Sequence, residues 1–536
     1  MNGPVVLGLI MRALFSIPYD VERPTKLGPV GGRIVHVLGQ PIEEYRGIPY
    51  AEPPVRELRF KPPVPAKAWE GTLDASNRRT GCPQTVRNGL MGGDIEYGED
   101  CLHLNVWTAE GRKRAPVLVW IHGGGFTYGS ASYENYTGAA IAARTGCVVA
   151  SINYRLGVLG FLNADSPEAP GNVGFLDQHL ALKWIKRNIR QFGGDPSRIT
   201  LFGESAGAMA VHAHVLSPMS RGLFRRAVAM SGAMNALDMS EAVHSSVVKG
   251  DALAAIVGCR PAHGGSLESR PDEVVGCLRN RSAEELVVAA SEAVPGKLFP
   301  FVPTYHDAFL PKVPAVAVRK GFFAADVDLL IGVTSDEGAM ALAWPQPRLH
   351  LLAENLDHID RAALHEELLQ VFSSWTGDAA PEMVEEEYAA KAASDGGSLR
   401  RQFVDYLSDR LFVCPMHAAA AAHASRGGAV YAYVFDHWPA KRARLPWAGV
   451  GHGMDLAYAF GLPLVDRENF VGEDVRASEQ LIDMIATFAE KGVPKSPARS
   501  PWPKYTAGAP VSLLLRNNSA TEVDSFHSTR CSLWSI

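Results

Sequence analysis

The sequence has few cysteines and no long apolar run. Seven cysteines in 536 residues are too few for a disulfide scaffold, and none stands in a C-x-x-C or other zinc-type spacing. No stretch of about 20 apolar residues occurs, so no membrane span is predicted. The sequence therefore gives no support for a metal site, a membrane-embedded protein or a small disulfide-rich fold.

An excess of charge of one sign is also missing. The formal net charge is −5 with 20% charged residues, and no surplus of basic residues marks a surface for nucleic acid or anionic lipid. We therefore exclude a nucleic-acid partner. The hydrophobic share of 47% is ample for a large core, whereas length alone leaves the number of domains open.

Short apolar runs alternate with helix-prone segments along much of the chain. Apolar residues recur at helical spacing over 176–192, which predicts a helix there. Two long helix-prone segments, 240–327 and 344–426, are interpreted as insertions that cap a sheet. Because strands that alternate with helices form right-handed crossovers, we expect a mostly parallel sheet covered on both faces. The strand candidates are 102–107, 117–121, 147–152, 199–202, 226–230, 328–333 and 430–435.

The stretch 199–210, I-T-L-F-G-E-S-A-G-A-M-A, carries the strongest chemical signal. Apolar and β-branched residues lead into G-E-S-A-G and small helix-forming residues follow, which predicts a strand, a sharp turn and a helix. Gly203 and Gly207 allow the chain to turn tightly where a side chain would clash. Ser205 is therefore the candidate nucleophile. Because an isolated G-x-S-x-G is a weak signal, its partners must be found elsewhere in the chain.

A serine hydroxyl becomes a nucleophile only when an oriented base takes its proton. Two later strand candidates lead to the pair Asp336 and Glu337 and then to His452, which stands between glycines. The order serine, acid, histidine is the one that α/β-hydrolases use. The acidic pair is also compatible with a solvated turn or a helix start, and the histidine with a surface position. The glycines at 123–125 follow a buried strand and indicate close approach of the backbone to a ligand, with a simple loop as the alternative.

Further motifs stand in register with this candidate site. They are G-I-P-Y-A at 47–51, E-D-C-L-H-L-N-V-W at 99–107, H-G-G-G-F at 122–126, N-Y-R at 153–155, G-N at 171–172, D-Q at 177–178 and F-G-G-D-P at 192–196. With them, the chain from about residue 21 to 505 resembles the type-B carboxylesterase and cholinesterase family of α/β-hydrolases. The resemblance implies an α/β fold, a central mostly parallel twisted sheet covered by helices on both faces, with long helical insertions. It implies a single domain at 21–536 after a possible signal or leader segment at 1–20.

The resemblance assigns a role to each reactive side chain. It implies Ser205 as the nucleophile, His452 as the base and Glu337 as the acid. Glu337 is preferred to Asp336 because the family's acid directly precedes a glycine. Since the base must be neutral, the rate is expected to rise with pH through an apparent pKa of about 6–7.

The resemblance also places groups around these side chains. The backbone N–H groups of Gly124, Gly125 and Ala206 are the implied oxyanion hole, and such donors contribute about 3–4 kcal/mol each in comparable enzymes. Glu204 and Ser231 are expected beside the reactive residues, with Ser231 either supporting the acid or serving as an ordinary hydroxyl at the end of a strand. This chemistry needs no metal and no cofactor.

The resemblance further implies disulfides between Cys82 and Cys101 and between Cys259 and Cys277, each contributing about 3 kcal/mol by closing a loop. Two such pairs indicate an oxidising compartment, so secretion or the endoplasmic-reticulum lumen is expected. Arg12 makes the leader atypical as a signal peptide, and a cytoplasmic location stays open. The N-glycosylation candidates are Asn135, Asn280 and Asn517.

Three cysteines have no implied disulfide partner. Cys147 lies in a strand candidate and is expected to be buried and inert. Cys531, near the end of the chain, is a candidate for pairing with a second chain. No role is assigned to Cys414.

The loop at 83–100 contains no tryptophan, which bears on the substrate. Cholinesterases bind a quaternary ammonium against aromatic faces, and the resemblance places two such rings where this chain has Met91 and Met340. We therefore predict a broad-specificity carboxylesterase for small-molecule esters and not a cholinesterase. A lipase or hormone-type esterase, or a slow-turnover protein that sequesters esters or organophosphates, is the alternative. A non-catalytic adhesion protein is disfavoured because serine, acid and histidine are all present. No oligomeric state is predicted.

Overall fold

The computed structural model describes most of the chain. The described residues are 19–77, 79–85, 95–236, 238–340, 388, 399–441, 449–497, 501–516, 519–524, 526, 530, 531 and 534. The predictions made for residues 1–18, Met91 and Asn517 lie outside them, as does most of the expected insertion at 344–426.

Strands and helices alternate along the described chain. The strands are β1 (Val21–Arg23), β2 (Val30–Val37), β3 (Gln40–Pro49), β4 (Leu73–Asp74), β5 (His103–Ala109), β6 (Ala115–Ile121), β7 (Val148–Ile152), β8 (Asn163–Ser166), β9 (Ala169–Pro170), β10 (Gly194–Glu204), β11 (Arg226–Met230), β12 (Asp328–Thr334), β13 (Val430–Phe435), β14 (Val511–Arg516) and β15 (Ser519–Asp524). The helices are α2 (Ala139–Thr145), α3 (Gly157–Phe161), α4 (Val173–Asn188), α5 (Ala206–Leu216), α6 (Val243–Ile256), α7 (Pro271–Arg279), α8 (Ala283–Ala293), α9 (Pro314–Lys320), α14 (Leu399–Ser408), α15 (Cys414–Ser425), α16 (Leu456–Ala459), α17 (Leu462–Val465) and α18 (Gly472–Lys491). Short helical turns are η1 (Arg56–Leu58), η2 (Glu134–Tyr136), η3 (Ile189–Phe192), η4 (Pro218–Ser220), η5 (Glu337–Ala339) and the π-helix η7 (Asp409–Val413).

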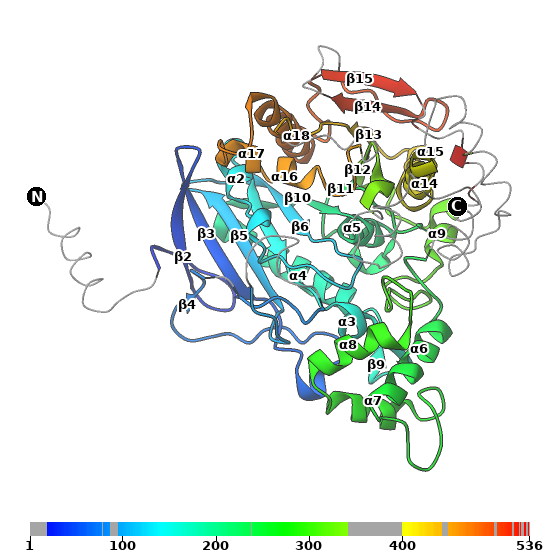
Figure 1. Ribbon diagram of the computed structural model, residues 1–536. Coiled ribbons are helices and arrows are strands. Elements are labelled where there is room, and N and C mark those ends of the chain that lie inside the picture. The colour runs from blue at the N-terminus through cyan, green and yellow to red at the C-terminus, as the bar shows by residue number, and fades with distance from the viewer. Residues whose placement is uncertain are drawn as a thin grey trace, which may run out of the picture.

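One large sheet runs through the centre of the molecule (Figure 1). In the described residues its strand order is β1-β2-β3-β5-β7-β6-β10-β11-β12-β13-β14-β15, with β4 beside β2. Neighbouring strands from β7 to β14 pair parallel, whereas the first four pairings, from β1 to β7, and the last, β14 with β15, are antiparallel. The predicted mostly parallel sheet is confirmed, and the antiparallel strands lie at its two edges.

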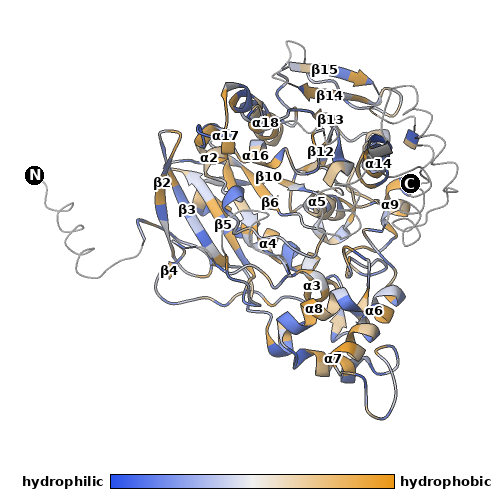
Figure 2. Ribbon diagram, viewed as in Figure 1, coloured by the Kyte–Doolittle hydropathy of each residue, from blue (hydrophilic) through white to orange (hydrophobic). Residues whose placement is uncertain are grey.

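Helices cover both faces of the sheet and bury two hydrophobic cores. Helices α4, α5 and α15 pack on one face, and α2 and α18 pack on the other. Figure 2 shows hydrophobic residues concentrated along the central strands β6 and β10. Both strands are almost continuously buried, as expected for parallel strands covered on both sides.

The parallel strands present the candidate site residues at one edge of the sheet. The carboxyl ends of β6, β10 and β12 lead directly to the glycine turn at 123–125, to Ser205 and to Glu337. His452 follows the end of β13 in a longer connection. The sheet thus brings residues that are far apart in the sequence together at one edge. In open parallel sheets, ligands bind in crevices at this edge.

Three disulfides join cysteines of the described chain. Cys82 bonds to Cys101 and Cys259 to Cys277. The third joins Cys414, the first residue of α15, to Cys531. The idea that Cys531 pairs with a second chain is therefore wrong, because its partner lies 117 residues earlier in the same chain. Cys147 is a buried free cysteine.

Candidate active site

The turn between β10 and α5 carries Ser205. Its φ of 57° and ψ of −127° lie where residues with a side chain are rarely found. Every residue from 199 to 217 is buried except Ser205, which is partly exposed. The N–H of Ser205 donates to the Met230 carbonyl at 2.9 Å, which fixes the turn against β11. The structure thus has the strand, turn and helix that the sequence predicts, with Ser205 at the accessible point.

The two glycines of the elbow pack against backbone. A Cβ atom on Gly203 would lie 2.5 Å from the carbonyl of Gly207, and one on Gly207 would lie 2.1 Å from the carbonyl oxygen of Ile121. Neither distance leaves room for a side chain. The glycines are therefore required for the close approach of strand β10, helix α5 and strand β6 at the point where Ser205 is exposed.

His452 and Glu337 form a short contact at this edge of the sheet. His452 Nδ1 lies 2.6 Å from Glu337 Oε2, and Glu337 is fully buried. The other oxygen of Glu337 accepts the Thr334 N–H at 2.7 Å. Asp336 instead accepts the N–H of Val450 at 2.9 Å. The structure therefore brings Glu337, and not Asp336, to the imidazole.

The second imidazole nitrogen faces the elbow. His452 Nε2 lies 3.1 Å from Oε1 of Glu204, the residue before Ser205. Among the described residues this nitrogen makes no hydrogen bond, and none joins it to the Ser205 hydroxyl. Catalytic hydrogen bonds are often long in free enzymes and tighten when substrate binds. The imidazole thus lies beside the turn that carries Ser205 and is held by Glu337 from its other side.

Three buried carboxyl groups surround His452. They belong to Glu204, Glu337 and Asp455, and no sequence motif had singled out Asp455. Both carboxyl oxygens of Asp455 lack a hydrogen-bond partner in the described part of the chain. Burial, together with the charges of Glu204 and Glu337, raises the pKa of Asp455 well above its ordinary value. Burial also raises the pKa of Glu204 to about 7.

The same carboxyl groups control the charge of the imidazole. Burial lowers the pKa of His452, but the carboxylates of Glu204 and Glu337 outweigh burial and raise it to about 9. The apparent pKa of about 6–7 expected from the sequence is that of an unperturbed histidine, and these carboxylates favour a higher pKa for His452. Because His452 and these carboxyl groups interact, the pKa values at which they lose protons belong to the whole cluster and not to single residues.

The turn after β6 places backbone donors beside the elbow. Gly124 and Gly125 have φ values of 106° and 59°, which glycine adopts without strain. Neither donates its N–H to another backbone group of the described chain. Ala206 is the first residue of α5, where an N–H has no acceptor within the helix. A Cβ atom on Gly123 would lie 3.1 Å from the Ser205 Cβ, so the turn that carries Gly124 and Gly125 lies next to Ser205.

Two aromatic rings that no motif identified also contact the site. The Phe299 ring packs against Gly125, where a Cβ atom would lie 1.9 Å from it. The Phe412 ring lies with its centroid 4.4 Å from that of the His452 imidazole. Phe299 also lines a cavity of about 500 Å³. Apolar residues lining this cavity include Met239, Leu298, Val302 and Tyr305.

Two other predicted residues lie near these groups. Ser231, directly after β11, is fully buried, and its N–H donates to the Gly332 carbonyl at 2.7 Å. Its hydroxyl has no hydrogen-bond partner among the described residues, so its support of Glu337 stays a prediction. Met340 follows the helical turn η5 and packs against the core.

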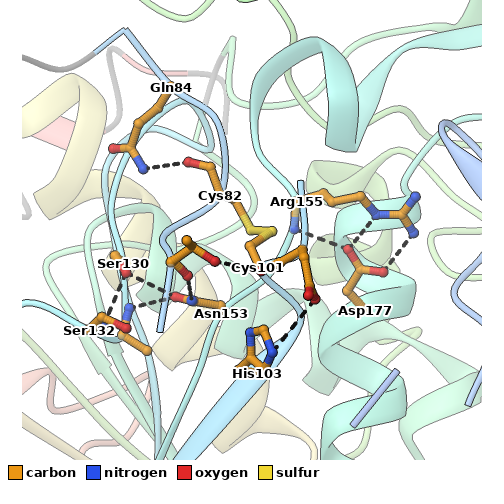
Figure 3. Close-up of a disulfide and its surroundings, with 12 residues drawn as sticks. Cys82, Gln84, Cys101, His103, Ser130, Ser132, Asn153, Arg155 and Asp177 are labelled. Carbon is orange, nitrogen blue, oxygen red and sulfur yellow. Dashed lines mark hydrogen bonds and ion pairs between the residues drawn. A yellow bond between two sulfur atoms is a disulfide. The ribbon is translucent and has the colours of Figure 1, made fainter. Parts of the chain in front are cut away.

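A disulfide and a buried ion pair hold the loops that carry several of the sequence motifs (Figure 3). The Cys82–Cys101 bond lies beside Asn153, whose side-chain oxygen accepts the N–H of Ala131 at 2.8 Å. Arg155 binds the Asp177 carboxylate through two side-chain nitrogens, at 2.7 and 2.8 Å. Motifs at 153–155 and 177–178 therefore join the loop after β7 to helix α4.

The described residues contain neither a metal-binding cluster nor a membrane-spanning helix. Within them, no group of three or more histidine, cysteine, aspartate or glutamate side chains is arranged to hold a metal ion. None of the described helices has the length and apolar character that crossing a membrane requires.

The central sheet and its crossover helices define the α/β-hydrolase fold, with Ser205 on its strand–turn–helix elbow. The sequence model of the carboxylesterase family matches residues 20–534, so this chain belongs to that family and is a carboxylic ester hydrolase. It is 36% identical to an acetylcholinesterase of Bungarus fasciatus over 531 residues, which cover 96% of this chain and 86% of the relative. It is 33% identical to an acetylcholinesterase of Leptinotarsa decemlineata over 545 residues, covering 96% and 85%.

Proposed function

We propose that the enzyme cleaves esters through an acyl-enzyme intermediate on Ser205. Glu337 holds the imidazole of His452, which takes the serine proton as Oγ attacks the ester carbonyl. His452 then gives this proton to the leaving alcohol, and water repeats the steps to release the acid. The observation that carries the proposal is the 2.6 Å contact between His452 and Glu337, because it fixes the base with its other nitrogen toward the elbow.

The attack places negative charge on the former carbonyl oxygen. In our proposal the N–H groups of Gly124, Gly125 and Ala206 stabilise this charge, since fixed donors need no reorganisation during the reaction. Every proton in the cycle moves between Ser205, His452, the alcohol and water, so the mechanism needs neither metal nor cofactor.

We also propose broad specificity for small esters and not a preference for choline esters. Both relatives named above are acetylcholinesterases, which favours choline esters as the second candidate. Against it, the loop at 83–100 has no tryptophan to receive a quaternary ammonium. Met340, near Glu337, is unbranched and adapts to irregular groups.

The nucleophile is tested by covalent labelling. We expect a fluorophosphonate to modify the wild-type enzyme at Ser205 and the Ser205→Ala variant to lose turnover of a nitrophenyl ester by about a millionfold. Ser220→Ala is the matched control, because Ser220 also contacts a buried histidine, with its Oγ 2.7 Å from His214 Nδ1. Labelling at another residue, or full activity in Ser205→Ala, would refute the assignment.

The substrate class is tested by comparing kcat/KM among esters. We expect a naphthyl or nitrophenyl ester to be cleaved more efficiently than acetylthiocholine. Equal or better cleavage of acetylthiocholine would favour a cholinesterase. A series of acyl chain lengths separates a carboxylesterase from a lipase, and a burst without sustained turnover would identify a sequestering protein.

We further propose that the protein folds in an oxidising compartment, by secretion or in the endoplasmic-reticulum lumen. Three disulfides within the described chain support this location. The sequon residues Asn135 and Asn280 are both exposed, so each is accessible to a glycan. Mass spectrometry of protein from the native source, with and without glycosidase, tests both sites.

A further inference from the structure

A π-helix lies against the catalytic histidine. Helices α14 and α15 are joined without a break by η7, Asp409–Val413. Single π-turns are rare and occur frequently at functional sites. This one carries Phe412, which is buried and whose ring plane makes an angle of 35° with the His452 imidazole at a centroid distance of 4.4 Å.

The first residue of the π-helix is held by a residue from the end of the chain. Asp409 is fully buried and accepts the Tyr388 hydroxyl at 2.8 Å. Arg530 Nε lies 3.2 Å from the same carboxylate, and Arg530 Nη1 lies 3.5 Å from Asp405 in α14. A buried guanidinium between two carboxylates fixes its partners strongly, because removing it would leave buried charges unpaired.

Two neighbours of Arg530 attach the chain end to the same helices. Cys531 is bonded to Cys414, two residues after Phe412. The Trp534 ring lies 5.0 Å from that of Tyr406 in α14. We call Arg530, Cys531 and Trp534 the C-terminal clamp, since together they contact α14, the π-turn and α15.

The clamped helices also contact the loops that carry the acid and the base. Arg401 forms ion pairs with both Asp336 and Asp405. Asp336 accepts the Val450 N–H, two residues before His452. Ser408 accepts the N–H of Gly338 at 2.8 Å, directly after Glu337. The clamp, the π-helix and the two catalytic loops therefore form one connected set of contacts.

We propose that Phe412 is a positioning residue for His452 and that the C-terminal clamp holds Phe412 in place. The proposal rests on the proposed role of His452 as the base. The ring packs against the imidazole and limits its rotation. It also attracts the imidazolium that forms when His452 takes the serine proton, because an aromatic ring attracts a cation. Glu204, Glu337 and Asp455 act on the same imidazole from the other elements.

Replacement of the ring tests its role. We expect Phe412→Leu to lower kcat about 3- to 30-fold, the range that loss of a cation–π contact allows. KM should change less, and the rise of kcat with pH should move to lower pH because the imidazolium is less stable. Phe412→Tyr keeps the aromatic ring and should restore both values. Phe323→Leu is the matched control, because Phe323 stacks on His423 at 5.1 Å, outside the site.

The clamp is tested in the full-length chain. We expect Arg530→Gln and Cys531→Ser to shift kcat and its pH profile in the same direction as Phe412→Leu. Arg144→Gln is the control, since Arg144 also bridges two carboxylates, Glu479 and Asp483. If Phe412→Leu does not fold, Phe412→Met replaces it, since methionine is similar in volume to leucine.

The outcomes separate the two levels of the proposal. An inactive wild-type enzyme that does not label at Ser205 refutes the proposed function and this inference with it. An active enzyme in which Phe412→Leu behaves like Phe323→Leu refutes only the positioning role. An effect of Phe412→Leu without one from Arg530→Gln or Cys531→Ser refutes the clamp.

Discussion

At the scale of single residues, the unusual feature is an imidazole between two carboxylates. Glu337 contacts Nδ1, as a triad requires, but Glu204 Oε1 also lies 3.1 Å from Nε2. Each carboxylate favours the protonated imidazole, whereas the base must be neutral. Because these carboxylates raise the pKa of His452 to about 9 against the effect of burial, we expect kcat/KM of the wild-type enzyme to keep rising up to about pH 9.

Replacing the second carboxylate should reverse part of this effect. In Glu204→Gln one anion is lost, so the pKa of His452 falls and the rise of kcat/KM should move down by about 1 unit or more. A pH profile with a nitrophenyl ester measures the shift. Glu43→Gln is the control, because Glu43 is a buried carboxylate that binds Arg23 and Tyr45 instead. Identical profiles for Glu204→Gln and wild type would show that Glu204 does not act on the base.

At the scale of elements, the sequence predicts those strands and turns that depend on local residue patterns. The apolar runs that became β6, β7, β10 and β12 are buried on both faces, so each reads as a strand without knowledge of its neighbours. The elbow was predictable because the turn itself leaves no room for a side chain at positions 203 and 207, so both must be glycine. The order of Ser205, Glu337 and His452 along these elements followed from the family pattern.

The elements that escaped prediction depend on distant partners. Strand β15 has no buried residue and pairs with β14 at the sheet edge, so its sequence carries little signal. Phe412 and Phe299 reach the site from insertions, and their positions depend on packing against His452 and Gly125. Asp455 resembles any acidic residue before a helix until its burial is known. The Cys414–Cys531 bond closes a separation of 117 residues that spacing cannot reveal.

At the scale of the whole molecule, one buried ion pair joins the sheet to the helical layer. Arg155 follows β7 and Asp177 lies in α4, and both are almost completely buried. Asp177 also accepts the backbone N–H of Arg155 at 3.0 Å. Burial raises the pKa of Asp177 although Arg155 lowers it. The attraction therefore does not fully offset the cost of burying the Asp177 carboxylate.

This balance makes the pair costly to break and less costly to replace. Asp177→Asn keeps an acceptor for the backbone N–H but leaves the buried Arg155 charge uncompensated, which should lower the free energy of unfolding by about 3–5 kcal/mol. Arg155→Met combined with Asp177→Asn removes that charge and should recover most of the loss. Urea midpoints of the three proteins, measured with the disulfides intact, test this order of stability. If the double variant is no more stable than Asp177→Asn, the unpaired charge of Arg155 does not explain the loss of stability in the single variant. The arginine would then stabilise the fold by packing.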